Sequence, residues 1–208
     1  MILRVVSGRI RPGQLHAVTE SFRAAYSPVA ARTPGLNRFV VATRPDDDGG
    51  HHLAAMTIWD SVELALAAYG GDLTRPRTLD GRDHGAALDR VDYYELGAGR
   101  TRIVDVEPAF LRLTAGTVAR GLDADIQQEL RLRLPDLPDE AVEAYVGRRV
   151  LEGSVEIAFA STWTSVPEGI RLDAPIWPAI SDRYERFRME VHEIALAGVG
   201  PSGLRTPD

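Results

Sequence analysis

The chain resembles itself, and this internal similarity constrains the possible folds more than any other feature of the sequence. Residues 2–10 read ILRVVSGRI and residues 110–118 read FLRLTAGTV, so a leucine, an arginine and a glycine recur with unchanged spacing. Residues 57–62 read TIWDSV and residues 161–166 read STWTSV, which places a tryptophan at the corresponding point of each half. Matches in the same order indicate that one structural unit occurs twice.

A third match lies near the end of each half. YYEL at residues 93–96 corresponds to VHEI at residues 191–194, and the separation between matching positions shortens steadily along the chain. A shorter loop in the second half explains this drift. We therefore expect a tandem repeat, with the first copy at residues 1–99 and the second at residues 106–197.

The apolar residues of the first copy change period from two to about 3.6 and back, which distinguishes strands from helices. Pro12 suits the first turn of a helix, and Asp60 with Glu63 three residues later forms a candidate capping box. The polar cluster at residues 46–50 predicts a turn between two strands. The predicted order is strand, helix, strand, strand, helix, strand, at residues 2–10, 15–29, 36–43, 51–59, 62–69 and 91–96.

The second copy follows the same order. Its predicted elements are strands near residues 109–119, 141–150 and 154–163, and a helix that carries Leu122, Ile126, Leu130 and Leu134. A second helical region extends to Phe187 and is interrupted by Pro167, Pro175 and Pro178. The second copy is therefore expected to have the weaker second helix.

Each copy is predicted to be a βαββαβ unit, which is the ferredoxin-like arrangement with both helices on one face of an antiparallel sheet. The other face of such a sheet must be covered. The second copy can provide this cover, so we expect an α+β fold of two ferredoxin-like units in one chain. The first and last strands of each unit are then neighbours, which predicts the cross-strand ion pairs Arg4–Glu95 and Arg112–Glu193.

The amino-acid composition excludes several catalytic mechanisms and classes of partner. All 24 basic residues are arginine, since lysine is absent, and cysteine is absent too. Schiff-base, amine-nucleophile and thiol chemistry are therefore excluded. The net charge of -6 and the lack of a basic run argue against nucleic acid as a partner. No apolar stretch is as long as a membrane span, and no signal-type segment is present, so we expect a cytoplasmic protein that does not bind membranes.

Three segments resemble the antibiotic biosynthesis monooxygenase family of dimeric α+β barrels: GRIRPGQ at residues 8–14, PGL at residues 34–36 and TIWDSVELALAAY at residues 57–69. That family normally pairs two chains to build its barrel. The resemblance therefore implies that the two repeats form an intrachain dimeric α+β barrel, a monomeric pseudo-dimer that leaves a further homodimer open. It also implies that ligands bind between the sheet and the helices.

The same resemblance implies a cofactor-independent monooxygenase that acts on a planar aromatic, polyketide-like substrate with neither metal nor flavin. In that chemistry an electron-rich phenol is deprotonated and its anion reduces oxygen. The implied catalytic residues are His51 or His52 as the proton acceptor and Arg38, or another arginine of the pocket, as the anion-binding cation. The implied substrate-binding residues are Tyr26, Trp59, Tyr69 and Ala55.

Strand alternation indicates that the first copy holds the ligand site. Ala55 aligns with Phe159 on the same face of the third strand of each copy. A small residue where the other copy has an aromatic ring predicts a cavity in the first copy only, unless neighbouring side chains fill the space. Ala55 also stands where characterised monooxygenases of the family tend to carry a polar amide.

Structural roles stay open for the same residues. Trp59 and its counterpart Trp163 are suited to anchoring a core, and His51 and His52 follow an aspartate-rich turn that is typical of a solvated hairpin. A non-enzymatic barrel that binds a small aromatic molecule is therefore the alternative function. An imidazole in a closed cavity beside Trp59 would favour an enzyme, whereas two solvent-exposed imidazoles would favour a binding protein.

Overall fold

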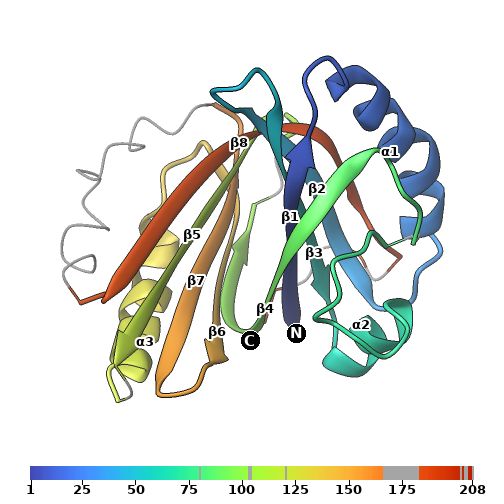
Figure 1. The fold of residues 1–208 in the computed structure, drawn as a ribbon. Helices are drawn as coiled ribbons and strands as arrows, with labels where there is room; N and C mark the ends of the chain where they lie inside the picture. The colour runs from blue at the N-terminus through green and yellow to red at the C-terminus, as the bar shows by residue number, and fades with distance from the viewer. Residues whose placement is uncertain are drawn as a thin grey trace. The chain divides into compact units, whose positions relative to one another are not determined.

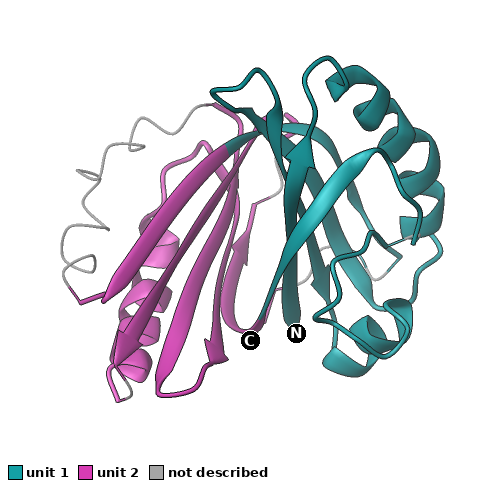
Figure 2. Ribbon diagram, viewed as in Figure 1, with its two compact units in different colours: residues 1–93, 192–205 teal, residues 94–191, 206–208 magenta. Residues whose placement is uncertain are grey.

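The computed structural model describes residues 1–79, 81–102, 105–119, 121–165, 183–201, 203 and 206–207. Its helices and strands are those of an α+β protein, as the sequence predicts (Figure 1). The chain divides into two compact units (Figure 2). Unit 1 comprises residues 1–93 and 192–205, and unit 2 comprises residues 94–191 and 206–208.

Unit 1 has the architecture of a ferredoxin-like unit. Its elements are β1 (Ile2–Ile10), α1 (Leu15–Ala30), β2 (Leu36–Pro45), β3 (His51–Trp59), α2 (Val62–Ala68), the first part of β4 (Ala86–Thr101) and the last part of β8 (Arg186–Val199). The strands are hydrogen-bonded in the order β4-β1-β3-β2, and β8 pairs with the free side of β2. Helices α1 and α2 lie on the same face of this sheet (Figure 1).

Unit 2 has the corresponding strand order. Its elements are β5 (Phe110–Ala119), α3 (Asp123–Arg133), the short 3-10 helix η1 (Leu134–Asp136), β6 (Ala141–Val150) and β7 (Ser154–Trp163), with parts of β4 and β8. The strands are hydrogen-bonded in the order β8-β5-β7-β6, and β4 pairs with β6. Pro167, Pro175 and Pro178 of the predicted second helix lie outside the described residues. Phe187 lies in β8, so its assignment to that helix is wrong.

The strands β4 and β8 are longer than the sequence predicts because each contributes to both compact units. In β4 the residues up to 93 belong to unit 1, and residues 95–101 pair with β6 in unit 2. In β8 the residues before 192 belong to unit 2, and residues 193–199 pair with β2 in unit 1. Each compact unit therefore includes a strand segment that the sequence alignment assigns to the other copy.

Helix α2 begins at a different cap from the predicted one. Ser61 is the N-cap, and its Oγ accepts a hydrogen bond from the backbone N–H of Leu64 at 3.3 Å. Asp60, the predicted cap, instead accepts a hydrogen bond from Nδ2 of Asn37 at 3.0 Å, and its own N–H donates to the carbonyl of Gly35 at 2.8 Å. Asp60 therefore connects the end of β3 to the start of β2.

The alternation of β3 and β7 determines which side chains face the helices. Leu53, Ala55 and Trp59 of β3 belong to a buried apolar cluster with residues of α1 and α2. Phe159 and Trp163 of β7 belong to the corresponding cluster with residues of α3. Burial of these faces is the main favourable contribution to the stability of each unit.

The glycine that recurs in both copies has the same packing role in each. A Cβ atom on Gly8 would lie 2.4 Å from the carbonyl oxygen of Ala87 in β4. A Cβ atom on Gly116 would lie 2.7 Å from the carbonyl oxygen of Arg186 in β8. Both distances are too short for a side chain, so glycine permits the close approach of these strands. At Gly116 the atom nearest to such a Cβ belongs to the Tyr184 ring, so a side chain as well as the backbone packs against this glycine.

We expect the substitution Gly8→Ala to lower the free energy of unfolding by about 1–3 kcal/mol, because the added methyl group meets backbone that cannot move aside. The matched control is Gly97→Ala in β4, where an added Cβ would meet no atom within 4 Å. That control should change stability by less than about 0.5 kcal/mol. Urea unfolding followed by circular dichroism measures both, and equal stabilities of the two variants would contradict the packing role of Gly8.

Candidate functional site

A buried arginine organises unit 1. Arg4 lies in β1 with 1% of its surface exposed. Its Nε donates to the carbonyl of Leu73 at 3.2 Å, and its Nη2 and Nη1 donate to the carbonyls of Arg75 at 2.8 Å and Arg77 at 3.3 Å. All three acceptors belong to the loop between α2 and β4. Because buried carbonyls require donors, this guanidinium fixes the course of the loop.

Tyr69 supports the guanidinium of Arg4. The Cζ atom of Arg4 lies 3.7 Å from the centre of the Tyr69 ring, a cation–π contact. The Tyr69 hydroxyl lies 3.3 Å from Oγ1 of Thr57, and the Tyr69 ring meets Trp59 edge-to-face with centroids 5.6 Å apart. Burial lowers the pKa of Arg4, and the neighbouring Tyr69 and Tyr26 oppose this effect. An arginine keeps its proton at neutral pH, so a positive charge is buried beside the loop.

These contacts differ from the ion pairs that the sequence predicts. Arg4 is held by carbonyl groups, whereas Glu95 belongs to unit 2 and lies opposite Arg148 in the register of β4 and β6. Arg112 is buried in unit 2, and desolvation lowers its pKa to about 10. Glu193 lies opposite Thr43 in unit 1. The prediction failed because β4 and β8 change strand neighbours at these glutamates.

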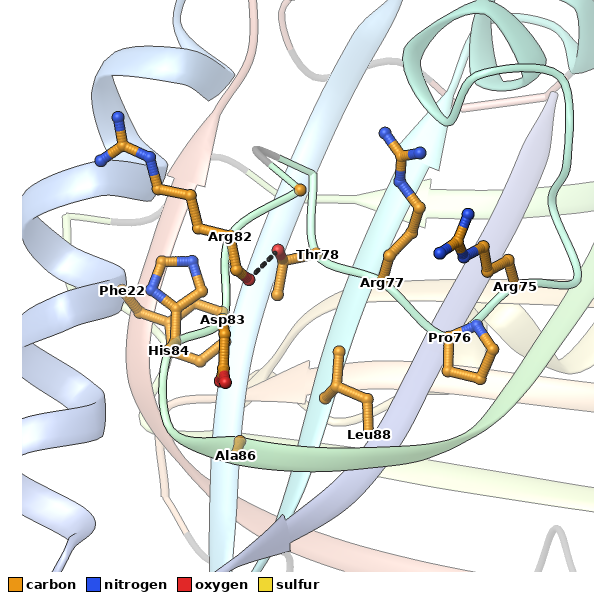
Figure 3. A pocket seen from close by; sticks show the side chains of 11 residues that line it. Phe22, Arg75, Pro76, Arg77, Thr78, Arg82, Asp83, His84, Ala86 and Leu88 are labelled. Carbon is orange, nitrogen blue, oxygen red and sulfur yellow. Dashed lines mark hydrogen bonds between the residues drawn. The ribbon is translucent and has the colours of Figure 1, made fainter.

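A pocket of about 390 Å³ lies beside the loop that Arg4 holds. Its lining comes from α1, the loop and the start of β4 (Figure 3). The lining residues are Phe22, Arg75, Pro76, Arg77, Thr78, Gly81, Arg82, Asp83, His84, Ala86 and Leu88. The volume is at the lower end of the range for small-molecule sites, and the lining combines apolar surface with several charged groups.

An aromatic pair forms one wall of the pocket. The His84 imidazole stacks on the Phe22 ring, with centroids 4.2 Å apart and planes inclined by 20°. Nδ1 of His84 lies 2.8 Å from Oγ of Ser21, which fixes the orientation of the ring. His84 is 6% exposed and Phe22 is fully buried, so the imidazole is the part of this pair that borders the pocket.

The rest of the lining is rich in positive charge. The lining includes three arginines, Arg75, Arg77 and Arg82, and one carboxylate, that of Asp83. Oδ1 of Asp83 accepts a hydrogen bond from the N–H of Gly85 at 2.7 Å. In Figure 3 the side chains of the three arginines extend from the loop on the side away from Leu88 and Ala86. Oγ1 of Thr78 donates to the carbonyl of Arg82 at 2.9 Å and closes the loop on itself, as the dashed line in Figure 3 shows. The pocket thus suits a planar ligand with negative charge.

The substrate-binding residues predicted from the sequence lie in the layer behind this pocket. Trp59, Tyr69, Tyr26 and Ala55 all belong to the buried cluster of unit 1, each with at most 4% of its surface exposed. Tyr26 meets Phe22 edge-to-face with centroids 5.6 Å apart, so it contacts the pocket wall without lining the pocket. The structure therefore brings these four residues together as core.

The predicted catalytic residues lie apart from this pocket. His51 and His52 are the first residues of β3, next to the turn that joins β2 and β3. Nε2 of His52 lies 3.3 Å from Oδ2 of Asp46, and 26% of the His52 side chain is exposed. Arg38 is buried in β2, opposite Ile58 of β3. None of the three lines the pocket.

The expectation of a cavity in the first copy only is wrong. Unit 2 has a pocket of about 540 Å³, lined by Ala98, Gly99, Arg100, Thr101, Arg131, Leu134, Pro135, Thr206 and Pro207. Phe159 packs within the core of unit 2 as expected, and it does not line this pocket, whose residues come from β4, α3, η1 and residues 206–207. Arg100 is held there by hydrogen bonds to the carbonyls of Leu134 and Leu137.

Sequence reasoning missed the residues that line the pocket of unit 1. Arg75, Arg77, Arg82 and His84 fall in one loop, and the arginine density of RPRTLDGRDH was the available signal. The stack of His84 on Phe22 had no local signal, because the two residues are distant in the sequence.

Among the described residues, no group of three or more histidine and carboxylate side chains could hold a metal ion. In the same part of the chain, no helix is sufficiently long and apolar to cross a membrane.

Solved structures provide the comparison with known proteins, since no protein-family model and no curated protein sequence matches the chain. A "putative monooxygenase" from Fusobacterium nucleatum superimposes with a TM-score of 0.69 at 11% identity, covering 95% of this chain and 94% of that one. Another, from Lactobacillus acidophilus, has a TM-score of 0.65 at 9% identity and covers 100% and 99%. An anthrone oxidase-like protein has a TM-score of 0.57 at 17% identity and covers 95% and 93%.

These similarities extend over nearly the whole chain and show that it shares the α+β fold of these proteins. The fold class predicted from the sequence, with two ferredoxin-like units in one chain, is thereby confirmed. Identities this low carry no site residue from one protein to another.

We expect Arg4→Leu to lower the free energy of unfolding by at least about 2 kcal/mol, because buried carbonyls lose their donors. Hydrogen exchange should accelerate at residues 73–77, and Arg4→Lys should not restore protection, since an ammonium lacks the planar fork. Arg9→Leu is the matched control on β1, because the Arg9 side chain is 58% exposed beside Asp46. Unchanged exchange in Arg4→Leu would show that the loop holds its course without this guanidinium.

Proposed function

We propose that the chain is a cofactor-independent monooxygenase that oxidises a planar aromatic substrate in the pocket of unit 1. One observation carries the proposal: the pocket combines a stacked, largely buried imidazole with apolar surface and three arginines. The anthrone oxidase-like and monooxygenase neighbours support it at the level of fold. A substrate with a flat ring system suits the Phe22–His84 wall, because aromatic rings gain from stacked contact.

The proposed reaction needs a base and a place for negative charge. His84 accepts a proton from a phenol or its keto tautomer, and the arginines stabilise the resulting anion. The anion transfers electrons to oxygen. A ring CH2 group then becomes a carbonyl: two C–H bonds and the O–O bond break, one oxygen atom forms the new C=O, and the other leaves as water with the two hydrogens. The four electrons that reduce oxygen come from the substrate.

This proposal assigns the base to His84 because His51 and His52 do not line the pocket. Trp59 and Tyr69 contribute as positioning residues, since Tyr69 supports Arg4 and Arg4 holds the loop that carries Arg75 and Arg77. Arg38 does not line the pocket either, so this proposal assigns anion binding to the arginines of the loop instead.

A non-enzymatic aromatic-binding protein is the second candidate. The observation that favours it is the position of His52, which is partly exposed and paired with Asp46 at the β2–β3 turn rather than placed in a cavity. Under this function the pocket binds an aromatic anion and no oxygen is consumed.

The test is oxygen uptake with anthrone, whose enol tautomer is a phenol, in buffer treated with a chelator. We expect one molecule of oxygen consumed per anthrone oxidised, and His84→Gln should lower the rate about 100-fold or more if His84 is the general base. His16→Gln in α1 is the control, because His16 is exposed and outside the pocket. Uptake no faster than in buffer, with anthrone bound, would favour the binding protein; equal rates in His84→Gln and His16→Gln would remove His84 from the mechanism.

A further inference from the structure

We propose that the pocket of unit 1 selects planar aromatic carboxylates and that Arg77 is the residue that binds the carboxylate. The inference rests on the proposed function in placing the substrate in this pocket, and it adds the charged group by which the substrate is recognised. Three features support this assignment: the surroundings of the Arg77 side chain, the positive charge of its neighbour Arg4, and the other residues that line the pocket.

The surroundings of Arg77 leave hydrogen-bonding capacity for a ligand. Its Nε is buried and has no hydrogen-bond partner among the described residues. The Arg77 side chain as a whole is half-buried, so its terminal nitrogens, rather than the enclosed Nε, are the groups with which a carboxylate can pair. Arg77 lines the pocket, and its side chain extends from the loop with the guanidinium at its far end (Figure 3).

Two glycines make room for the Arg77 side chain. A Cβ atom on Gly70 would lie 3.3 Å from Nη1 of Arg77, and one on Gly81 would lie 3.8 Å from Nη2. Both glycines have positive φ angles, 68° and 70°, which side chains rarely adopt. The backbone on each side thus confines the guanidinium, which reduces the entropy that ligand binding must overcome.

A second positive charge, that of Arg4, lies close to Arg77. Arg4 and Arg77 are close enough for the charge of Arg77 to lower the pKa of Arg4. Arg4 is held by three carbonyls, which bear no formal charge. A ligand anion placed on Arg77 therefore relieves the repulsion between two guanidinium groups as well as pairing with one of them.

The wall beside Arg77 selects the rest of the ligand. The Phe22 ring is fully buried and stacks on His84, so the His84 imidazole is the aromatic surface that this pair can offer to a ligand, and Leu88 and Ala86 add apolar contact in the same pocket. An aliphatic carboxylate would gain only the charge interaction, whereas an aromatic one gains stacking too. The ligand class that uses the whole pocket is thus a planar aromatic acid.

The test compares 2-naphthoate with 2-naphthamide, a neutral molecule of nearly the same shape, by isothermal titration calorimetry on the full chain. The wild type should bind the carboxylate at least about 10-fold more tightly, the value expected for a charge-assisted hydrogen bond. Arg77→Gln should reduce this preference to less than about twofold and leave the amide affinity unchanged. Arg11→Gln, an exposed arginine outside the pocket, should keep the wild-type preference.

A second measurement keeps the proposal testable if Arg77→Gln does not fold. In the wild type, 2-naphthoate should slow hydrogen exchange in residues 75–88 and around Phe22, and added potassium chloride should weaken the carboxylate more than the amide. Equal affinities for the two ligands, a preference that survives in Arg77→Gln, or protection confined to the pocket of unit 2 would each overturn the proposal. These assays need no turnover, so absent oxygen uptake with intact carboxylate selectivity would refute the proposed oxidation alone.

Discussion

The buried guanidinium of Arg4 must find hydrogen-bond acceptors, and this requirement determines how unit 1 is built around its pocket. A charged group cannot be buried without compensation, and five N–H donors need several acceptors at once. The loop between α2 and β4 supplies three carbonyls, and the Tyr69 ring supplies a cation–π surface. These contacts determine the course of the loop, and this course places Arg75 and Arg77 in the lining of the pocket.

Unit 2 balances its buried charge in a different way. Glu156 accepts from Arg149 and lies 3.4 Å from Arg188, and the Tyr94 hydroxyl donates to the same carboxylate at 3.3 Å. The side chains of Arg149 and Arg188 are 20% and 35% exposed, so in this cluster partly exposed guanidinium groups neutralise a buried carboxylate. The acceptors of Arg4 in unit 1 are carbonyl groups, which bear no formal charge and therefore do not neutralise its positive charge. The two halves have the same strand order, but the buried charge of the Glu156 cluster in unit 2 is negative and paired with arginines, whereas that of Arg4 in unit 1 is positive and has uncharged carbonyl acceptors.

The strands could be predicted from sequence more fully than the site. The predicted bounds of β1, β3, β6 and β7 agree with the structure because apolar alternation is a local signal. The full lengths of β4 and β8 were missed because their neighbours are set by distant parts of the chain. Ser61 displaced Asp60 as the cap of α2 because Asp60 has a competing partner in Asn37, which no local pattern indicates.

The failure of the Ala55 prediction shows why pockets are harder to predict than strands. Replacing an aromatic ring by a methyl group leaves space only if the neighbours do not close it, and protein interiors are packed too densely to leave it open without cause. Trp59, Tyr69 and Tyr26 share the buried cluster with Ala55, so large side chains occupy that region of unit 1. The pocket arises instead beside a loop whose backbone is held by Arg4 and closed by Thr78, where backbone hydrogen bonds rather than side-chain volumes determine the spacing. A cavity of this kind depends on the course of a loop, and an alignment of strand residues carries no information about that course.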